Sequence, residues 1–86
     1  MNFEYDENKS LSNKQKHGID FEEAKLLWYD DRMVELRASY EDEERFVNIG
    51  KINEKFYTVI TTMRNGKIRI ISARRSRKKE IEIYES

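Results

Sequence analysis

The residues of this 86-residue chain that could do chemistry are mostly cationic and lie close together near its C-terminus. Positions 64–79 contain no acidic residue and carry eight basic ones: Arg64, Lys67, Arg69, Arg74, Arg75, Arg77, Lys78 and Lys79. Because the formal net charge of the whole chain is zero, this stretch polarises the molecule. A cluster of this kind produces a local positive potential that attracts a polyanion.

Phosphate binding is the chemistry that this basic stretch favours. We expect Arg69 on a strand and Arg74 and Arg75 at a strand-to-helix corner. A guanidinium anchored on a rigid element can hold a phosphate through two hydrogen bonds at little entropic cost. Lys78 and Lys79 are expected nearer a flexible surface, where they supply non-specific attraction. The alternative interpretation is a solvated basic start of a helix.

His17 is the only histidine, and the glycine after it indicates that it ends a helix. The negative end of the helix dipole there favours the protonated imidazole, although a simple cap or surface residue remains the alternative. With one histidine and no cysteine, neither a zinc site nor a disulfide is expected. The acidic run of residues 41–44 lacks the ligand spacing of a calcium loop.

The sequence has no motif for a protein nucleophile, because a GxSxG element, a phosphate-cradling glycine loop and a cysteine–histidine pair are all absent. RNA carries its own nucleophile in the 2′-OH. Cleaving it needs a positioned base, cations for the developing phosphorane charge and an acid for the leaving oxygen. A small, metal-free and arginine-rich sheet is compatible with that chemistry.

Two short helices are expected to precede the sheet. Asp6 is suited to be the N-cap of the first helix, and Gly18 to end it in the left-handed conformation. Asp20 and Glu23 have the spacing of a capping box for the second helix, and Phe21 and Leu27 lie on its apolar face.

From residue 32 the apolar period becomes two, which predicts strands at 32–40, 45–52, 55–63 and 67–75. Asn65-Gly66 predicts a tight type I′ hairpin turn between the last two. A short helix follows at 76–84. The expected fold class is therefore α+β, with two short N-terminal helices, a four-stranded antiparallel meander and a short C-terminal helix. We expect residues 1–86 to form a single domain without a signal peptide or membrane span, located in the cytoplasm.

Four segments resemble the BrnT family of bacterial type II toxins: "FEYD" at 3–6, "NKQKHGIDFEEA" at 13–24, "IG" at 49–50 and "RIISARRSRKKEIEIY" at 69–84. This resemblance implies a ribonuclease toxin with a RelE-like fold, which a cognate BrnA-like antitoxin holds silent in a hetero-oligomer and which needs no cofactor. The DNA-binding part of that antitoxin recognises an operator. The positions that match the family pattern are Asn13, Lys16, His17, Gly18, Arg69, Ser72, Arg74, Glu80 and Tyr84. Ile81 stands where the family has an arginine.

The resemblance and the chemistry together give a hypothesis for the site. Arg69 and Arg74 would grip the scissile phosphate with support from Lys16, and His17 would be acid or base. Glu80 or Tyr84 would fill the other proton-transfer role. The alternatives are a salt bridge for Glu80 and core packing for Tyr84. The expected RNA-binding residues are Lys16, Arg64, Lys67, Arg75, Arg77, Lys78 and Lys79, and no metal ligand is expected. A module that binds nucleic acid or a partner without cutting is the rival interpretation.

Overall fold

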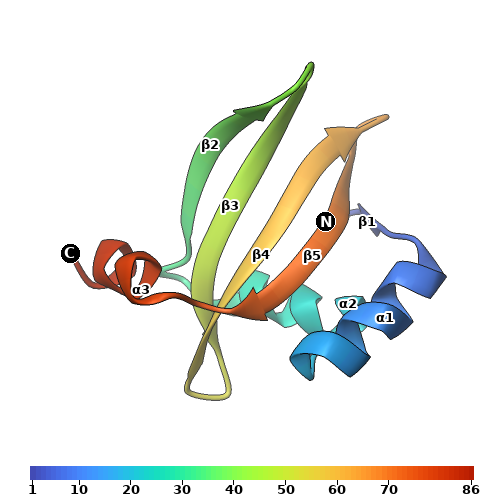
Figure 1. Cartoon of the computed structure of the whole chain (residues 1–86). Helices are drawn as coiled ribbons and strands as arrows, with labels where there is room; N and C mark the ends of the chain where they lie inside the picture. Colours follow the sequence, from blue (N-terminus) through green and yellow to red (C-terminus); the bar gives the residue numbers. More distant parts are fainter.

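The computed structural model describes all residues, 1–86, and shows a twisted sheet with helices on both sides (Figure 1). The strands follow the order β1-β5-β4-β3-β2 across the sheet. Their bounds are β1 Phe3–Glu4, β2 Val34–Tyr40, β3 Glu43–Ile52, β4 Lys55–Arg64 and β5 Lys67–Arg75. Strands β2 to β5 pair antiparallel to their neighbours, whereas β1 runs parallel to β5.

The expected arrangement of a four-stranded antiparallel meander behind two N-terminal helices is wrong. The α+β class is observed, but the chain begins with a strand, and the sheet is a mixed one of five strands accompanied by three helices. The two residues of β1 are too few to show an alternating pattern. The strand is recognisable only from its pairing with β5, where the Ile68 N–H donates to the carbonyl of Asn2 at 2.8 Å.

Helix α1, Glu7–His17, begins and ends where the sequence predicted. The Asp6 carboxylate accepts hydrogen bonds from the backbone N–H groups of Asn8 and Lys9. Gly18 has a φ of 75°, and its N–H bonds to the carbonyl of Lys14. A residue with a side chain would be strained there, so Gly18 fixes where the helix stops.

The second predicted helix is shorter than expected. The capping box of Asp20 and Glu23 is confirmed, but α2 contains only Phe21–Ala24 and continues as the 3₁₀ helix η1, Lys25–Tyr29. Phe21 and Leu27 are fully buried against the sheet. Gly50 of β3 permits this approach, because a Cβ atom there would lie 3.0 Å from Leu27 Cδ1.

Alternation along the strands divides the sheet into two faces. The core face carries Val59, Ile70 and Ala73, which pack with Phe21 and Leu27. The opposite face, here called the open face, carries the side chains of alternate residues; across β3, β4 and β5 these include the paired Arg45, Thr62 and Arg69.

Helix α3, Lys78–Glu85, covers only one end of the open face. It has no buried residue, although the expected inward positions, Ile81 and Tyr84, are both half-buried. The ring of Tyr84 meets that of Phe56 edge to face, with centroids 5.4 Å apart. The remainder of the open face is left uncovered. No helix of the chain has the length and apolar character that crossing a membrane requires.

Candidate functional site

Asn13 of α1 joins the two blocks of sequence that carry the candidate site. Its Nδ2 donates to the carbonyls of Ile19 and Ala73, each at 2.8 Å, and its Oδ1 accepts from the Ala73 N–H at 3.3 Å. The side chain thus hydrogen-bonds to the outer edge of β5 as a neighbouring strand would. It is 7% exposed, so these groups have little access to water. Asn13 brings the C-terminal end of α1 to the end of β5, 60 residues away.

Tyr57 of β4 lies at this meeting point. It lines a small hollow of about 130 Å³ together with Gly18, Ile19 and Lys55, among others. The guanidinium carbon of Arg75 lies 5.6 Å from the centroid of the Tyr57 ring. Tyr5 and Tyr84 each donate to a carboxylate, whereas the Tyr57 hydroxyl has no partner in the chain.

The guanidinium of Arg75 is fixed through its Nε, while its terminal nitrogens are free. Its Nε donates to the carbonyl of Phe56 at 3.3 Å, while neither terminal nitrogen has an acidic partner. A guanidinium fixed through Nε and by stacking on a ring keeps its terminal N–H groups available in a defined direction. Such a group is well prepared to bind a phosphate.

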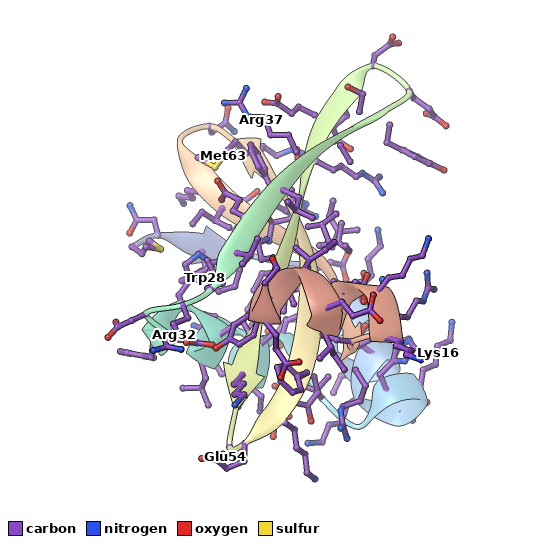
Figure 2. The ribbon with its side chains drawn as sticks, turned by 90° about the vertical axis from the view of Figure 1, so that its left-hand side faces the viewer. Lys16, Trp28, Arg32, Arg37, Glu54 and Met63 are labelled. Atoms are coloured by element: carbon purple, nitrogen blue, oxygen red, sulfur yellow. The ribbon has the colours of Figure 1, made fainter.

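Lys16 and His17 are exposed at the end of α1 and form no hydrogen bond or ion pair through their side chains. Figure 2 shows Lys16 at the margin of the molecule, pointing away from the sheet. The neighbouring Lys14, in contrast, is paired with Glu23 at 2.7 Å. We define the α1 corner as Lys16 and His17 at the end of α1 with Tyr57 and Arg75 at the adjoining ends of β4 and β5, because Asn13 joins these ends; the side chains of Lys16 and His17 contact neither Tyr57 nor Arg75.

Arg74 faces the other side of the sheet from Arg75 and is fully engaged. Its Nη1 and Nη2 each lie 2.8 Å from an oxygen of Glu80, and the two side chains are 21% and 15% exposed. The hydrogen bonds from Arg74, with further ones from Arg77 N–H and Thr58, outweigh burial and lower the pKa of Glu80 to about 2. The Glu80 carboxyl is ionised at neutral pH and has no proton to donate there.

Tyr84 is also engaged, through the carboxylate of Asp30. Its hydroxyl donates to Asp30 Oδ2 at 2.7 Å, and burial together with this hydrogen bond raises the pKa of Tyr84. Asp30 additionally accepts from the N–H groups of Arg32 and Lys51. The carboxylate therefore holds the end of η1, β3 and the end of α3 together.

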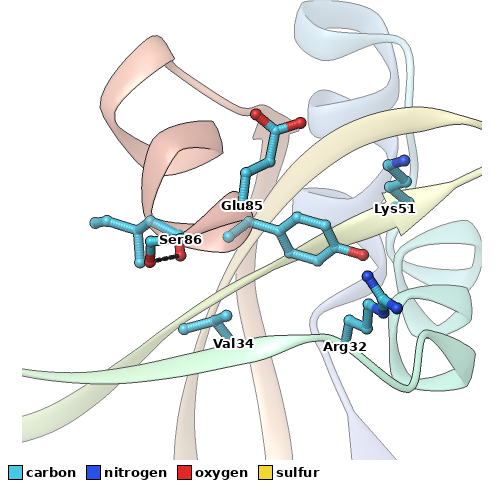
Figure 3. A pocket seen from close by; sticks show the side chains of 7 residues that line it. Arg32, Val34, Lys51, Glu85 and Ser86 are labelled. Carbon is cyan, nitrogen blue, oxygen red and sulfur yellow. Dashed lines mark hydrogen bonds between the residues drawn. The ribbon is translucent and has the colours of Figure 1, made fainter.

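A wide surface hollow of about 800 Å³ opens beside the end of α3. Figure 3 shows Arg32 and Lys51 together on one side of it, with Val34 below and Glu85 and Ser86 on the opposite side. The two cations come from different elements and would favour an anion, while Glu85 opposes one. Its mixed charge makes this hollow a weaker candidate than the α1 corner.

Arg69 lies far from Arg74 along β5. They are five positions apart in an extended strand, which corresponds to about 16 Å. Arg69 Nη1 pairs instead with Glu4 at 3.1 Å. The structure therefore does not bring Arg69 and Arg74 together on one phosphate, and neither contacts His17. Their expected catalytic roles, like those of Glu80 and Tyr84, stay predictions.

The other expected RNA-binding residues fall into two groups. Arg77, Lys78 and Lys79 are exposed at the start of α3, where Arg77 is the N-cap. Arg64 and Lys67 face each other across the hairpin at the far end of β4 and β5. No group of three or more His, Cys, Asp or Glu side chains is placed to hold a metal ion.

Comparison with models of known families identifies the family of the chain. Residues 5–80 match the model of the family described as BrnT, the ribonuclease toxin of type II toxin–antitoxin systems. The chain belongs to the BrnT family. No curated protein matches it closely enough to be counted as a relative. Membership implies a ribonuclease toxin with an RNA substrate and an antitoxin partner. The matched range includes all of α1, β4 and β5, and hence the whole α1 corner.

Sequence reasoning missed Tyr57 in this BrnT family member. Its proximity to Arg75 depends on the register of β4 against β5, which shifts between Ile60 and Thr61. Counting back from the Asn65-Gly66 turn without that bulge would pair Arg75 with Phe56. Tyr57 and Arg75 face each other because β5 contains one extra residue, a β-bulge. The local sequence pattern does not predict this bulge.

Proposed function

We propose that this BrnT family member is a metal-independent endoribonuclease that uses the 2′-OH of its RNA substrate as the nucleophile. The α1 corner supports this most directly. The ammonium of Lys16, the imidazole of His17 and the guanidinium of Arg75 all have free ends there. Together they supply the base or acid and the cations that 2′-OH attack requires.

In this proposal Arg75 and Lys16 bind the scissile phosphate. Each well-aimed donor contributes about 2.7–4 kcal/mol to stabilising the charge of the phosphorane. His17 transfers one proton and the Tyr57 hydroxyl the other. One of them takes the proton of the 2′-OH as the 2′-oxygen attacks phosphorus, and the other protonates the departing 5′-oxygen. The products are a 2′,3′-cyclic phosphate and a free 5′-OH.

The ion pair of Arg74 with Glu80 has a positioning role in this scheme. It fixes the junction of β5 and α3 next to Arg75. Tyr84 likewise holds α3 through Asp30. Neither Glu80 nor Tyr84 is needed as the acid, because the pKa of Glu80 is about 2 and the Tyr84 hydroxyl is already committed to Asp30.

The test is incubation of the purified protein with RNA in the presence of EDTA. We expect fragments that end in 2′,3′-cyclic phosphate or 3′-phosphate. His17→Ala should lower the cleavage rate by about 10²-fold or more. Gln15→Ala, an exposed neighbour on the same helix, is the matched control and should retain the rate. If the protein binds RNA without cleaving it, the endoribonuclease proposal is wrong and the chain is a nucleic-acid-binding module.

The antitoxin in this proposal is BrnA-like and works in the cytoplasm by placing acidic side chains over the basic surface. Such a partner also stabilises a small domain by mass action. Expression of the toxin alone should arrest growth, and co-expression of the neighbouring gene should restore it. Continued growth on expression of the folded toxin alone would contradict the proposed toxicity.

A further inference from the structure

A second cationic cluster lies on the open face, at the end of the sheet away from α3. It surrounds a hollow of about 210 Å³, here called the distal hollow, which is lined by Lys9, Glu43, Arg45, Thr62, Arg64, Arg69 and Ile71. The four cations come from α1, β3, β4 and β5. Their convergence from four elements is a property of the fold and not of a charge run in the sequence.

Strand register explains why these side chains meet. Arg45 pairs with Thr62, and Thr62 pairs with Arg69, so the three residues lie side by side across β3, β4 and β5. Thr62 is buried, and its hydroxyl donates to the carbonyl of Glu44 at 2.8 Å. The short Thr62 side chain therefore lies at the base of the hollow, and the longer side chains of Arg45 and Arg69 line it on either side.

The acidic partners of these arginines leave most of their donors free. Arg45 uses Nε for Glu43 at 3.2 Å, and Arg69 uses Nη1 for Glu4 at 3.1 Å. Both pairs are single-point contacts, so each guanidinium keeps terminal N–H groups that a phosphate can bind. Lys9 and Arg64 have no acidic partner within the chain. The hollow keeps a positive charge after its internal pairs are counted.

An aromatic ring stands beside the hollow. Tyr40, at the end of β2, is 53% exposed, and the guanidinium carbon of Arg45 lies 4.3 Å from its ring centroid. Proteins that bind single-stranded nucleic acids commonly place an exposed aromatic ring next to cationic side chains. The ring stacks on a base and the cations contact the phosphate backbone.

We propose that the distal hollow binds a phosphodiester of single-stranded RNA outside the cleaved bond, with Tyr40 stacking on an adjacent base. The RNA identity of the ligand rests on the proposed function. Only one apolar residue, Ile71, lines the hollow, which suits a phosphate better than a protein interface with its apolar centre. Lys9, Arg45 and Tyr40 thereby join the substrate-binding surface.

The test measures binding of a 2′-O-methyl RNA oligonucleotide, which cannot be cleaved, to Arg45→Ala, Arg64→Ala and Tyr40→Ala. We expect each variant to raise Kd about five- to tenfold. Each arginine removed should also reduce the slope of log Kd against log salt concentration by about 0.7. Arg64 is exposed and outside the core, so its variant keeps the test valid if Arg45→Ala fails to fold.

Arg37→Ala is the matched control. Arg37 belongs to the same β2–β3 hairpin but pairs with Phe46, so its side chain is on the opposite face from Arg45. Figure 2 shows Arg37 on the same side of the ribbon as Met63 and Trp28. Its variant should change Kd less than twofold.

The outcomes separate the two proposals. A wild-type protein that fails to cleave RNA contradicts the proposed function, while the binding series still tests the hollow. If the wild type cleaves RNA and all three variants bind the oligonucleotide like Arg37→Ala, the hollow is not an RNA site. Variants that bind RNA normally but lose the antitoxin would assign the hollow to the protein partner instead, and this too would overturn the inference.

Discussion

Arg74 and Glu80 form a two-point ion pair in which both terminal nitrogens of the guanidinium lie 2.8 Å from carboxylate oxygens. Glu80 also accepts from the Arg77 N–H at 2.7 Å and from Thr58 at 3.0 Å. The carboxylate thus joins the end of β5, the start of α3 and the middle of the sheet. The pair holds in place the segment that carries much of the basic charge.

This ion pair predicts a pH dependence of stability. Because the pKa of Glu80 falls to about 2 in the folded chain, its contribution is complete above about pH 4.5 and is lost as the pH falls towards 2. Glu80→Gln should lower the free energy of unfolding at pH 7 by up to about 3 kcal/mol. The gap between the two proteins should close by about pH 2, as measured by urea unfolding at a series of pH values.

Glu82→Gln is the control for that series, because Glu82 is exposed on the same helix. Its unfolding curve should follow that of the wild type. A constant gap between wild type and Glu80→Gln from pH 7 to 2 would show that ionisation of Glu80 does not stabilise the fold.

Asn13 should be among the most sensitive positions of the chain. Asn13→Ala leaves the buried Ala73 N–H and the carbonyls of Ala73 and Ile19 without their hydrogen bonds, which should cost about 3 kcal/mol. Chemical unfolding measures this loss. Asn8→Ala, exposed on the same helix, should be nearly neutral; equal effects of the two substitutions would be inconsistent with this account.

Two tyrosine-to-phenylalanine substitutions separate positioning from catalysis. Tyr84→Phe keeps the ring against Phe56 and removes the hydrogen bond to Asp30, so it should lower stability by about 1–2 kcal/mol and preserve RNA cleavage. Tyr57→Phe removes a hydroxyl without a partner and should leave stability within about 0.5 kcal/mol.

The same Tyr57→Phe protein should cleave RNA at least about 10²-fold more slowly. Single-turnover cleavage and urea unfolding of both variants provide the two measurements. If Tyr84→Phe abolishes cleavage in a protein that is still folded, Tyr84 belongs to the reaction and Tyr57 does not replace it.

Gly50→Ala should destabilise the packing of η1 on the sheet. The added Cβ would lie 3.0 Å from Leu27 Cδ1 and 3.1 Å from Asp30 Oδ2. We expect a loss of about 1–3 kcal/mol, because both contacts must shift. Thermal unfolding beside Ser39→Ala, a change on the exposed edge strand β2, would measure it; a Tm equal to that of the control would show that the site relaxes freely.

Local signals predicted the ends of α1 and the turn between β4 and β5, although they missed β1 and the early end of α2. Asp6 and Gly18 bound α1 as expected, and Asn65 and Gly66 both have positive φ, at 53° and 76°. These residues act through their own backbone or that of close neighbours, so a single sequence is sufficient to recognise them. The ion pair of Glu4 with Arg69 joins residues 65 positions apart, so no local sequence pattern predicts it.

The candidate site was harder to predict than the fold, because the sequence shows where basic residues are concentrated but not towards which face of the sheet each side chain projects. Arg74 and Arg75 are adjacent in the sequence but project from opposite faces of the sheet, one towards Glu80 and one towards Tyr57. Which arginine is free depends on a bulge and on partners that only the folded chain defines. The sequence shows the basic stretch, but it does not show which of its arginines form ion pairs and which stay free.

The contact of Asn13 with Ala73 also has a consequence for biosynthesis. A chain that is still being translated lacks the last strand until most of its length has been made, and before then α1 can contact only the segment that follows it, Ile19 and Phe21, and not the sheet edge at Ala73. A growing or prematurely terminated polypeptide that stops before residue 73 therefore cannot assemble the corner that holds His17 and Arg75. Any activity of the α1 corner would therefore begin only after nearly the whole chain has been made.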